Sequence, residues 1–266
     1  MKKKELTKQI REKKSYLCIG LDTDLKRIPS QFLKTDDPIF EFNKVIIDNT
    51  KDLCVAYKMN IAFYESLGYK GWQSLQKTVE YIPDNIFTIA DAKRGDIGNT
   101  SKQYAKTFFE TYDFDAITVS PYMGEDSISP FLEFDNKWVI ILGVTSNKGS
   151  NDFQMLKTDG KYIYEKVLET SAKWGSDENI MFVAGATHPE LFSEIRKIVP
   201  DNFLLIPGVG AQGGDLEKIS KYALNKDVGV LVNVSRGIIF PKDENDFPNN
   251  VRKSAEFYQN EMKKYI

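Results

Sequence analysis

The sequence predicts a closed (β/α)8 barrel, a fold class indicated by three features of the chain. Short apolar runs, rich in β-branched residues and too short for helices, recur eight times along the 266 residues. Amphipathic stretches separate these runs, which predicts parallel strands joined by helical crossovers. No linker rich in proline, glycine or serine divides the chain, so we expect one barrel domain over residues 1–266. A doubly wound open sheet is the structural alternative, because periodicity does not show closure.

The expected elements follow in order along the chain. The strands are residues 16–22, 54–60, 86–91, 115–120, 138–144, 180–186, 203–209 and 229–235. Apolar residues three or four apart predict helices around 40–47, 104–109 and 191–198, and a short helix is expected near the N-terminus. One long irregular stretch, about 146–160, follows the fifth run and predicts an insertion at the C-terminal face of the barrel.

The chain contains a single histidine, which restricts the chemistry it can perform. His188 alone cannot supply the histidine sets of catalytic zinc sites, and Cys18 and Cys54 lie too far apart for a Cys-x-x-Cys pair. We therefore expect no metal site, and acid–base chemistry carried by Lys, Asp, Glu or Tyr. Thr187 and Glu190 flank the histidine in a capping-box pattern, which predicts a helix start and a structural role for His188.

Composition restricts the cellular compartment and the classes of binding partner that we expect for the protein. Two cysteines are too few for a disulfide scaffold, and the basic residues 1–14 precede no apolar signal core. No apolar run reaches the roughly 18 residues needed to span a membrane. We therefore expect a cytoplasmic protein that is not membrane-bound. A net charge of −2 provides no basic stripe, so nucleic acid is not an expected partner.

Polar residues collect where the expected strands end, which is where the active site of a barrel lies. These strand ends carry Asp22, Lys58, Asn60, Asp91, Lys93, Thr145, Pro207, Gly208, Ser235 and Arg236. Charged residues are scarce inside the strands themselves, so a general need for solubility does not explain the clustering.

The third run ends in the sharpest local pattern, D-x-K-x-x-D from Asp91 to Asp96. Asp91 and Lys93 are two residues apart on an extended chain, so both side chains are expected to face the barrel mouth. Lys58 ends the neighbouring strand and can approach them, and the alternating charges would keep the lysines protonated and the aspartates ionised. Asp96 falls in the next loop or first helical turn. The structural alternative is a helix cap at Asp96 beside a purely structural ion-pair network.

A glycine-rich loop at 207–215 follows the seventh run, and residues 233–237 follow the eighth. Loops at these two positions of a barrel frequently hold a phosphate, because glycines let backbone N–H groups approach its oxygens. Arg236 would add a two-pronged contact. Turns also need glycine, so the loop alone is a weak signal, and it is the pairing with Arg236 that favours a phosphate site.

Six motifs, in order along the chain, carry a resemblance to a known family. They are GLD at 20–22, YKMN at 57–60, DAKRGDIGNT at 91–100, FVAGATHPE at 182–190, PGVGAQGGD at 207–215 and VSRGI at 234–238. With these motifs the chain resembles the orotidine 5'-phosphate decarboxylase family, in its longer bacterial and protozoal branch. The resemblance implies an enzyme of pyrimidine biosynthesis that converts orotidine 5'-monophosphate to uridine 5'-monophosphate (UMP) and CO2 without a cofactor.

The resemblance also implies residue roles in catalysis. Lys93 matches the lysine that protonates C6 of the pyrimidine, and Asp91 matches the aspartate beside the substrate carboxylate. Lys58 matches the lysine that contacts the ribose and Asp91. Asp96 and Thr100 match residues that the family donates across a dimer interface, which implies a homodimer.

Substrate-binding positions follow from the same resemblance. They are Asp22 and Asn60 for the ribose, either Thr145 or Ser146 for the pyrimidine, and Gln212 and Arg236 for the phosphate, with Pro207, Gly208 and Ser235 nearby. The chain departs from the family at Ser120, where an asparagine is expected before Pro121, so no role is implied for that position.

Three other functions stay open on the sequence alone. A related barrel with the same D-x-K-x-x-D pattern, such as a 3-keto-gulonate phosphate decarboxylase or a hexulose phosphate synthase, would bind Mg2+ with its carboxylates. A Schiff-base aldolase would use Lys58 or Lys93 as its nucleophile. A catalytically silent barrel would only bind a nucleotide or a sugar phosphate.

Overall fold

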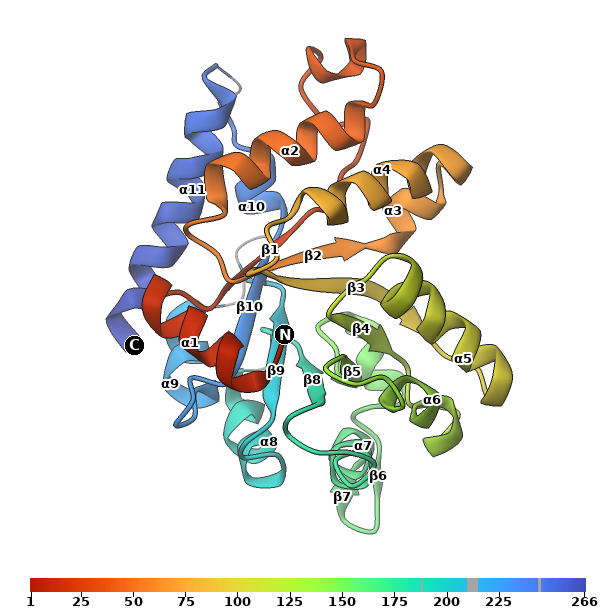
Figure 1. The fold of residues 1–266 in the computed structure, drawn as a ribbon. Helices are drawn as coiled ribbons and strands as arrows, with labels where there is room; N and C mark the ends of the chain where they lie inside the picture. The colour runs from red at the N-terminus through yellow and green to blue at the C-terminus, as the bar shows by residue number, and fades with distance from the viewer. Residues whose placement is uncertain (188, 210–214, 244) are drawn as a thin grey trace.

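Parallel strands form a closed barrel in the computed structural model, which describes residues 1–187, 189–209, 215–243 and 245–266 (Figure 1). The strands hydrogen-bond in the closed order β1-β10-β9-β8-β5-β4-β3-β2, so the predicted barrel is confirmed and the open sheet is wrong. They are β1 (Leu17–Gly20), β2 (Ala56–Asn60), β3 (Phe87–Arg94), β4 (Ala116–Val119), β5 (Trp138–Val144), β8 (Ile180–Ala184), β9 (Phe203–Pro207) and β10 (Val230–Val234).

All eight predicted strands are confirmed, and only their ends differ. β1 ends at Gly20, so Asp22 lies in the loop that follows it. β3 continues beyond Asp91 to Arg94, because it pairs with β4 again at Arg94 and Val119 after a shift in register. The end of β3 therefore holds both Asp91 and Lys93.

Helices cover the outside of the barrel (Figure 1). They are α1 (Lys3–Lys13), α2 (Pro38–Thr50), α3 (Ile61–Glu65), α4 (Gly68–Tyr81), α5 (Gly98–Lys106), α6 (Ser129–Leu132), α7 (Ile163–Ser171), α8 (Phe192–Ile198), α9 (Leu216–Ala223), α10 (Arg236–Ile239) and α11 (Phe247–Met262). The helices predicted around 40–47, 104–109 and 191–198 are α2, α5 with the π-helical turn Thr107–Thr111 that continues it, and α8. None of the helices in the described ranges combines the length and the apolar character that crossing a bilayer requires.

The helix start predicted within residues 187–190 is a 3-10 turn that leads into α8. This turn spans Pro189–Leu191, and α8 begins at Phe192. The hydroxyl of Thr187 donates to the backbone carbonyl of Ser146 at 3.3 Å, so it links this segment to the loop after β5. His188 lies outside the described residues, and its predicted structural role stays a prediction.

The N-terminal helix closes the end of the barrel where the strands begin. The ammonium group of Met1 forms an ion pair with Asp115 at 2.7 Å, and the indole N–H of Trp138 donates to the Met1 carbonyl at 2.8 Å. Beneath them, Trp138 packs edge-on against Phe87 and Phe203, which begin β3 and β9. This aromatic layer fills the inside of the barrel at this end, so the barrel interior opens towards the opposite end, where the active sites of such barrels lie.

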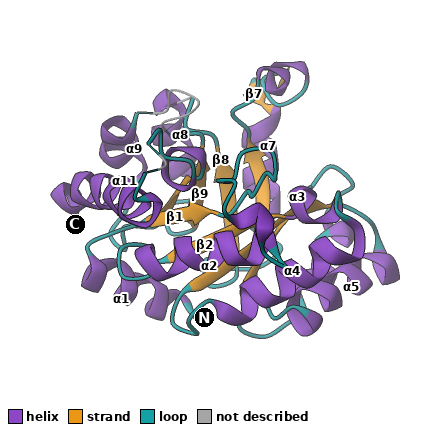
Figure 2. Ribbon diagram, turned by 90° about the horizontal axis from the view of Figure 1, so that it is seen from above, coloured by secondary structure: helices purple, strands orange, loops and turns teal. Residues whose placement is uncertain are grey.

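The long stretch after β5 is more ordered than the sequence predicts. It contains a 3-10 turn at Lys148–Asp152 and a small antiparallel hairpin of β6 (Lys157–Thr158) and β7 (Lys161–Tyr162). Figure 2 shows this hairpin standing out from the barrel at the end opposite α1. The stretch therefore borders the mouth formed by the C-terminal ends of the strands.

Candidate active site

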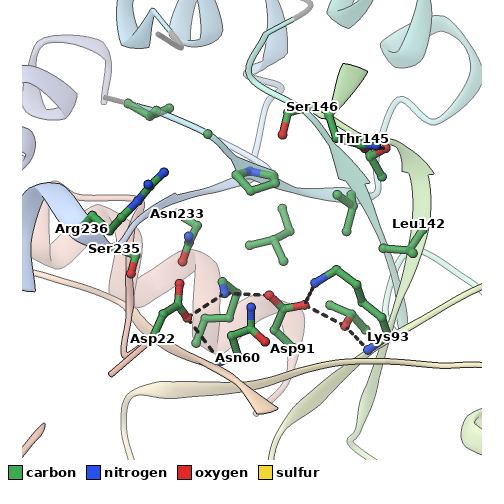
Figure 3. Close-up of a pocket in the computed structure, with 18 residues that line it drawn as sticks. Asp22, Asn60, Asp91, Lys93, Leu142, Thr145, Ser146, Asn233, Ser235 and Arg236 are labelled. Atoms are coloured by element: carbon green, nitrogen blue, oxygen red, sulfur yellow. Dashed lines mark hydrogen bonds and ion pairs between the residues drawn. The ribbon is translucent and has the colours of Figure 1, made fainter. Parts of the chain in front are cut away.

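A cavity of about 420 Å³ opens at the C-terminal ends of the barrel strands (Figure 3). Its lining includes most residues that the sequence indicates: Asp22, Lys58, Asn60, Asp91, Lys93, Thr145, Ser146, Pro207, Gly208, Ser235 and Arg236. Asp96 and Thr100 are not among the described residues that line it. Gln212 lies outside the described residues.

A chain of opposite charges runs across the floor of the cavity (Figure 3). Lys58 is 3% exposed, and its Nζ donates to Asp91 Oδ2 at 2.8 Å and to Asp22 Oδ1 at 3.5 Å. Lys93 Nζ donates to the other oxygen of Asp91, Oδ1, at 2.5 Å. Asp91 thus lies between two ammonium groups, which the neighbouring ends of β2 and β3 bring together.

These contacts fix the charge states of the buried groups. Burial by itself raises the pKa of the Asp91 carboxyl, but the ammonium groups of Lys58 and Lys93 outweigh it and hold that pKa well below its usual range. Burial lowers the pKa of Lys58, but Asp22 and Asp91 more than compensate, so this pKa lies above its ordinary value. At neutral pH Asp91 is therefore an anion and Lys58 a cation.

The backbone at Lys93 differs from the extended strand that the sequence predicts. Lys93 has a φ of 47°, in the left-handed region, and the ladder between β3 and β4 shifts between Ala90 and Arg94. The side chains of Asp91 and Lys93 meet as predicted. The reason is not the predicted one, because the backbone between them is not a regular extended strand. The hydroxyl of Thr118 on β4 accepts a hydrogen bond from the Lys93 N–H at 2.9 Å and donates to Asp91 Oδ1 at 3.1 Å.

A buried polar cluster holds the loop that carries Asp22. Thr23 donates to the Asn43 side-chain oxygen at 2.5 Å, and Asn43 Nδ2 donates to the Tyr64 hydroxyl at 3.0 Å and to Thr78 at 3.1 Å. The Tyr64 hydroxyl in turn donates to the carbonyl of the residue before Asp22 at 2.9 Å. Both neighbours of Asp22 are thereby fixed by side chains from α2, α3 and α4.

The opposite wall of the cavity comes from the end of β5 and the stretch after it. Gln154 folds back onto Thr145, since its Oε1 accepts from the Thr145 N–H at 2.8 Å and its Nε2 donates to the Thr145 hydroxyl at 2.9 Å. Gly185 lies so close to Ser146 that a Cβ at this position would stand 2.7 Å from the Ser146 backbone nitrogen. Glycine is therefore required in the FVAGATHPE motif where β8 meets this wall.

The third side of the cavity contains Pro207, Gly208, Ser235 and Arg236. Gly208 has a φ of 104°, which favours glycine, and Ser235 Oγ donates to the Gly20 carbonyl at 3.0 Å. Arg236 is exposed, and within the described part of the chain its guanidinium has no hydrogen bond or ion pair. Figure 3 shows it at the end of the cavity opposite Lys93, where it can receive an anion.

Asp96 and Thr100 are not among the described residues that line this cavity. Asp96 Oδ1 accepts from the Ile97 N–H at 2.8 Å, but the residue that precedes α5 as its N-cap is Ile97, so the alternative of an Asp96 helix cap is wrong. Ile97, Tyr122 and Met123 are 52%, 88% and 46% exposed. In one chain, therefore, Asp96 and Thr100 are not part of the charged floor.

Several residues of the lining were not singled out by sequence reasoning, although two of them, Val209 and Asn233, lie within the segments that it assigned to a phosphate site. They are Thr118, Leu142, Asn147, Val183, Leu205, Val209 and Asn233. Most belong to strands, where an apolar or small polar residue gives no signal that distinguishes the inside of the barrel from its helix-covered outside. Asn233 is the exception, because an asparagine within the apolar run at 229–235 is a signal that could have found it.

Fold and site together define the class: a (β/α)8-barrel enzyme, with two lysines and two aspartates gathered at the C-terminal ends of its strands. The chain belongs to the orotidine 5'-phosphate decarboxylase / HUMPS family, whose model matches residues 15–246. This confirms the family resemblance of the sequence motifs.

Known proteins match this chain in sequence and in structure over nearly its full length. An orotidine 5'-phosphate decarboxylase of Christiangramia forsetii is 58% identical, covering 98% of this chain and 97% of its own. One of Flavobacterium johnsoniae is 56% identical, covering 100% of this chain and 98% of its own. Among solved structures, the Leishmania donovani OMP decarboxylase has a TM-score of 0.88 at 36% identity, covering 100% of this chain and 99% of its own. The Methanocaldococcus jannaschii enzyme, complexed with the inhibitor BMP, has a TM-score of 0.69 at 27% identity, covering 92% and 97%.

Proposed function

We propose that this chain decarboxylates orotidine 5'-monophosphate to UMP and CO2 in pyrimidine biosynthesis, without a cofactor. Relatives more than half identical over nearly the whole chain carry the name of this enzyme. The observation that carries the proposal is the Lys58–Asp91–Lys93 array, in which Asp91 lies between two ammonium groups on the cavity floor.

In the proposed reaction, the bond between C6 and the carboxylate carbon breaks and its electron pair stays on C6. CO2 leaves, and the Lys93 ammonium donates a proton to C6, which gives UMP and a neutral lysine that solvent reprotonates. No cofactor delocalises the carbanion, so its stabilisation falls to fixed charge, which acts more strongly in a site shielded from water. Asp91 and Lys58 hold the donor in place, because the two oxygens of Asp91 accept from the two lysines separately.

The rest of the cavity is proposed to bind the nucleotide along its length. Asp22 and Asn60 bind the ribose, and they share a contact in which the Asn60 N–H donates to Asp22 Oδ1 at 3.3 Å. Thr145 or Ser146 contacts the pyrimidine from the wall after β5. Gln212 and Arg236 bind the phosphate beside Pro207, Gly208 and Ser235; the exposed guanidinium of Arg236 at the end opposite Lys93 supports this direction.

A direct assay tests this function: the absorbance change of orotidine 5'-monophosphate on decarboxylation, measured without added metal. We expect turnover by the wild-type chain and none by Lys93→Ala, because the proton donor is removed. Near-normal turnover by Lys93→Ala would refute the role of Lys93 as proton donor, although the chain would still be shown to be a decarboxylase. An inactive wild-type chain that still binds UMP would instead favour the catalytically silent barrel.

Two enzymatic alternatives are tested by separate treatments. Borohydride would trap the adduct of a Schiff-base aldolase; the buried Lys58 is unsuited to that role, because its raised pKa keeps it protonated. EDTA would inactivate a barrel that uses Mg2+. The oxygens of Asp91 already accept from Lys58, Lys93 and Thr118, which leaves this carboxylate poorly placed to bind a cation.

We also propose that the chain is a homodimer in which Asp96 and Thr100 reach the site of the neighbouring subunit. Asp96 is followed directly by the exposed Ile97, and the exposed Met123 lies close to Gly95, which supports an interface there, since apolar side chains gathered on a surface favour association. The two cysteines, Cys18 and Cys54, are free and buried, which supports a reducing compartment and hence the cytoplasm.

Mixing two inactive variants tests the shared site. Lys93→Ala and Asp96→Ala are each expected to lack activity, whereas their mixed dimer combines an intact Lys93 and an intact Asp96 in one of its sites. Random exchange of subunits in a symmetric dimer should then restore about a quarter of the wild-type activity. No recovery, with mixed dimers verified by mass, would place Asp96 outside the partner's site.

A further inference from the structure

We propose that Thr118 is a positioning residue for Lys93: its hydroxyl fixes the backbone of the proton donor and the carboxylate that holds its ammonium group. The inference rests on the role of Lys93 under the proposed function. It starts from the ladder between β3 and β4, whose register shifts beside the cavity. Residues Ala90 and Arg94 of β3 pair with Ile117 and Val119 of β4. Three residues of β3 are therefore opposed by a single residue of β4, which is Thr118.

This bulge removes the ordinary backbone partners of the residues within it. Lys93 has a φ of 47°, a region that side chains other than glycine rarely adopt, so the conformation needs support from its surroundings. The Thr118 hydroxyl gives that support by accepting the Lys93 N–H at 2.9 Å, in the place where a carbonyl of β4 would accept it in a regular ladder.

The same hydroxyl also orients the carboxylate. It donates to Asp91 Oδ1 at 3.1 Å, and this oxygen accepts from Lys93 Nζ at 2.5 Å. The contacts form a closed loop from the Lys93 backbone, through Thr118 and Asp91, to the Lys93 ammonium group. The side chain of Lys93 is 51% exposed, so packing does not restrict it, and this loop is what selects its orientation.

Both hydrogen bonds of the loop depend on the hydroxyl. It accepts one hydrogen bond and donates another, whereas valine has the same shape and can do neither. Thr118 is 1% exposed, so in Thr118→Val water cannot readily replace the two lost contacts. We expect the Lys93 backbone to leave its left-handed conformation and its ammonium group to move from its place beside Asp91.

The same two strands contain a matched control at their other end. The Thr88 hydroxyl on β3 accepts from the Asp115 N–H at 2.9 Å and donates to Asp115 Oδ2 at 3.1 Å, the same two contacts at the same two distances. Thr88 is buried as well, but it lies at the closed end of the barrel, away from the cavity. Thr88→Val therefore loses an equivalent pair of hydrogen bonds without touching Lys93.

The test compares Thr118→Val, Thr118→Ser and Thr88→Val in steady-state decarboxylation. We expect kcat of Thr118→Val to fall about 10- to 100-fold with KM nearly unchanged, because a displaced donor affects chemistry and not binding. Thr118→Ser keeps the hydroxyl and should recover most of the kcat. Thr88→Val should keep the wild-type kcat even where its thermal midpoint falls as far as that of Thr118→Val.

Two results would overturn the positioning role: a wild-type kcat in Thr118→Val, or an equal loss of kcat in Thr118→Ser and Thr118→Val. An equal loss in Thr88→Val would show a general effect of stability and would overturn it too. A crystal structure of Thr118→Val without substrate separates this inference from the proposed function. If Lys93 keeps its positive φ and its contact with Asp91 there, Thr118 does not position it, whatever the reaction is.

Discussion

Replacing Asp91 by asparagine tests whether the two lysines hold it ionised in the folded chain. The substitution keeps the shape of the side chain and removes its charge. Lys58, buried on the cavity floor, is then left with Asp22 as its remaining anion, at 3.5 Å. Removing one partner of a buried ion pair leaves an uncompensated charge, so we expect the free energy of unfolding to fall by about 3 kcal/mol at pH 6.

The dependence of this loss on pH follows from the depressed pKa of Asp91. A carboxyl with a lowered folded-state pKa stabilises the fold above its unfolded pKa, and that stabilisation is lost as pH falls towards the folded value. With an unfolded pKa of about 3.9, linkage removes about 1.3 kcal/mol from the wild type between pH 6 and pH 3, and nothing at this position from the variant. The difference between the two chains should therefore narrow to about 2 kcal/mol at pH 3.

Urea denaturation of both chains at pH 6 and pH 3 measures this difference. Asp113→Asn is a suitable control, because Asp113 pairs with Lys137 on the surface, where an ion pair contributes little. Its unfolding curve should stay close to that of the wild type at both pH values. If the wild type and Asp91→Asn lose equal stability between pH 6 and pH 3, Asp91 is not held ionised by its lysines and the account of the site's electrostatics fails.

Three further predictions concern the phosphate end, the polar cluster and metal dependence. Arg236→Ala should lower kcat/KM for the nucleotide about 10- to 100-fold and leave turnover of the nucleoside orotidine unchanged; equal effects on both would remove Arg236 from the phosphate site. Asn43→Ala should lower the free energy of unfolding by about 3 kcal/mol, since Thr23 loses its acceptor and the hydroxyls of Tyr64 and Thr78 each lose a donor, and a shift in the urea midpoint measures it. Exhaustive dialysis against EDTA should leave decarboxylation intact; loss of activity that Mg2+ restores would favour the metal-dependent alternative.

The fold could be predicted because apolar residues recur with regular spacing along the sequence. Each strand is a short apolar run between amphipathic stretches, and this pattern depends only on residues near one another in the sequence. The same reasoning located Asp22, Lys58, Asp91 and Lys93, because polar side chains at the ends of apolar strands are conspicuous. It did not predict that the Thr187 hydroxyl donates to the carbonyl of Ser146, because this contact joins two loops that are far apart in the sequence.

The sequence by itself determined the number of barrel strands and their order along the chain, the edge of the barrel at which polar residues gather, and the family to which the chain belongs. Only the tertiary structure decided how the charged residues contact one another. Asp22 and Lys58 meet because β1 and β2 lie side by side, and Lys93 meets Asp91 through a bulge that Thr118 supports from β4. Strand register and barrel closure depend on hydrogen bonds between residues far apart in the chain, and a local sequence pattern does not record those pairings.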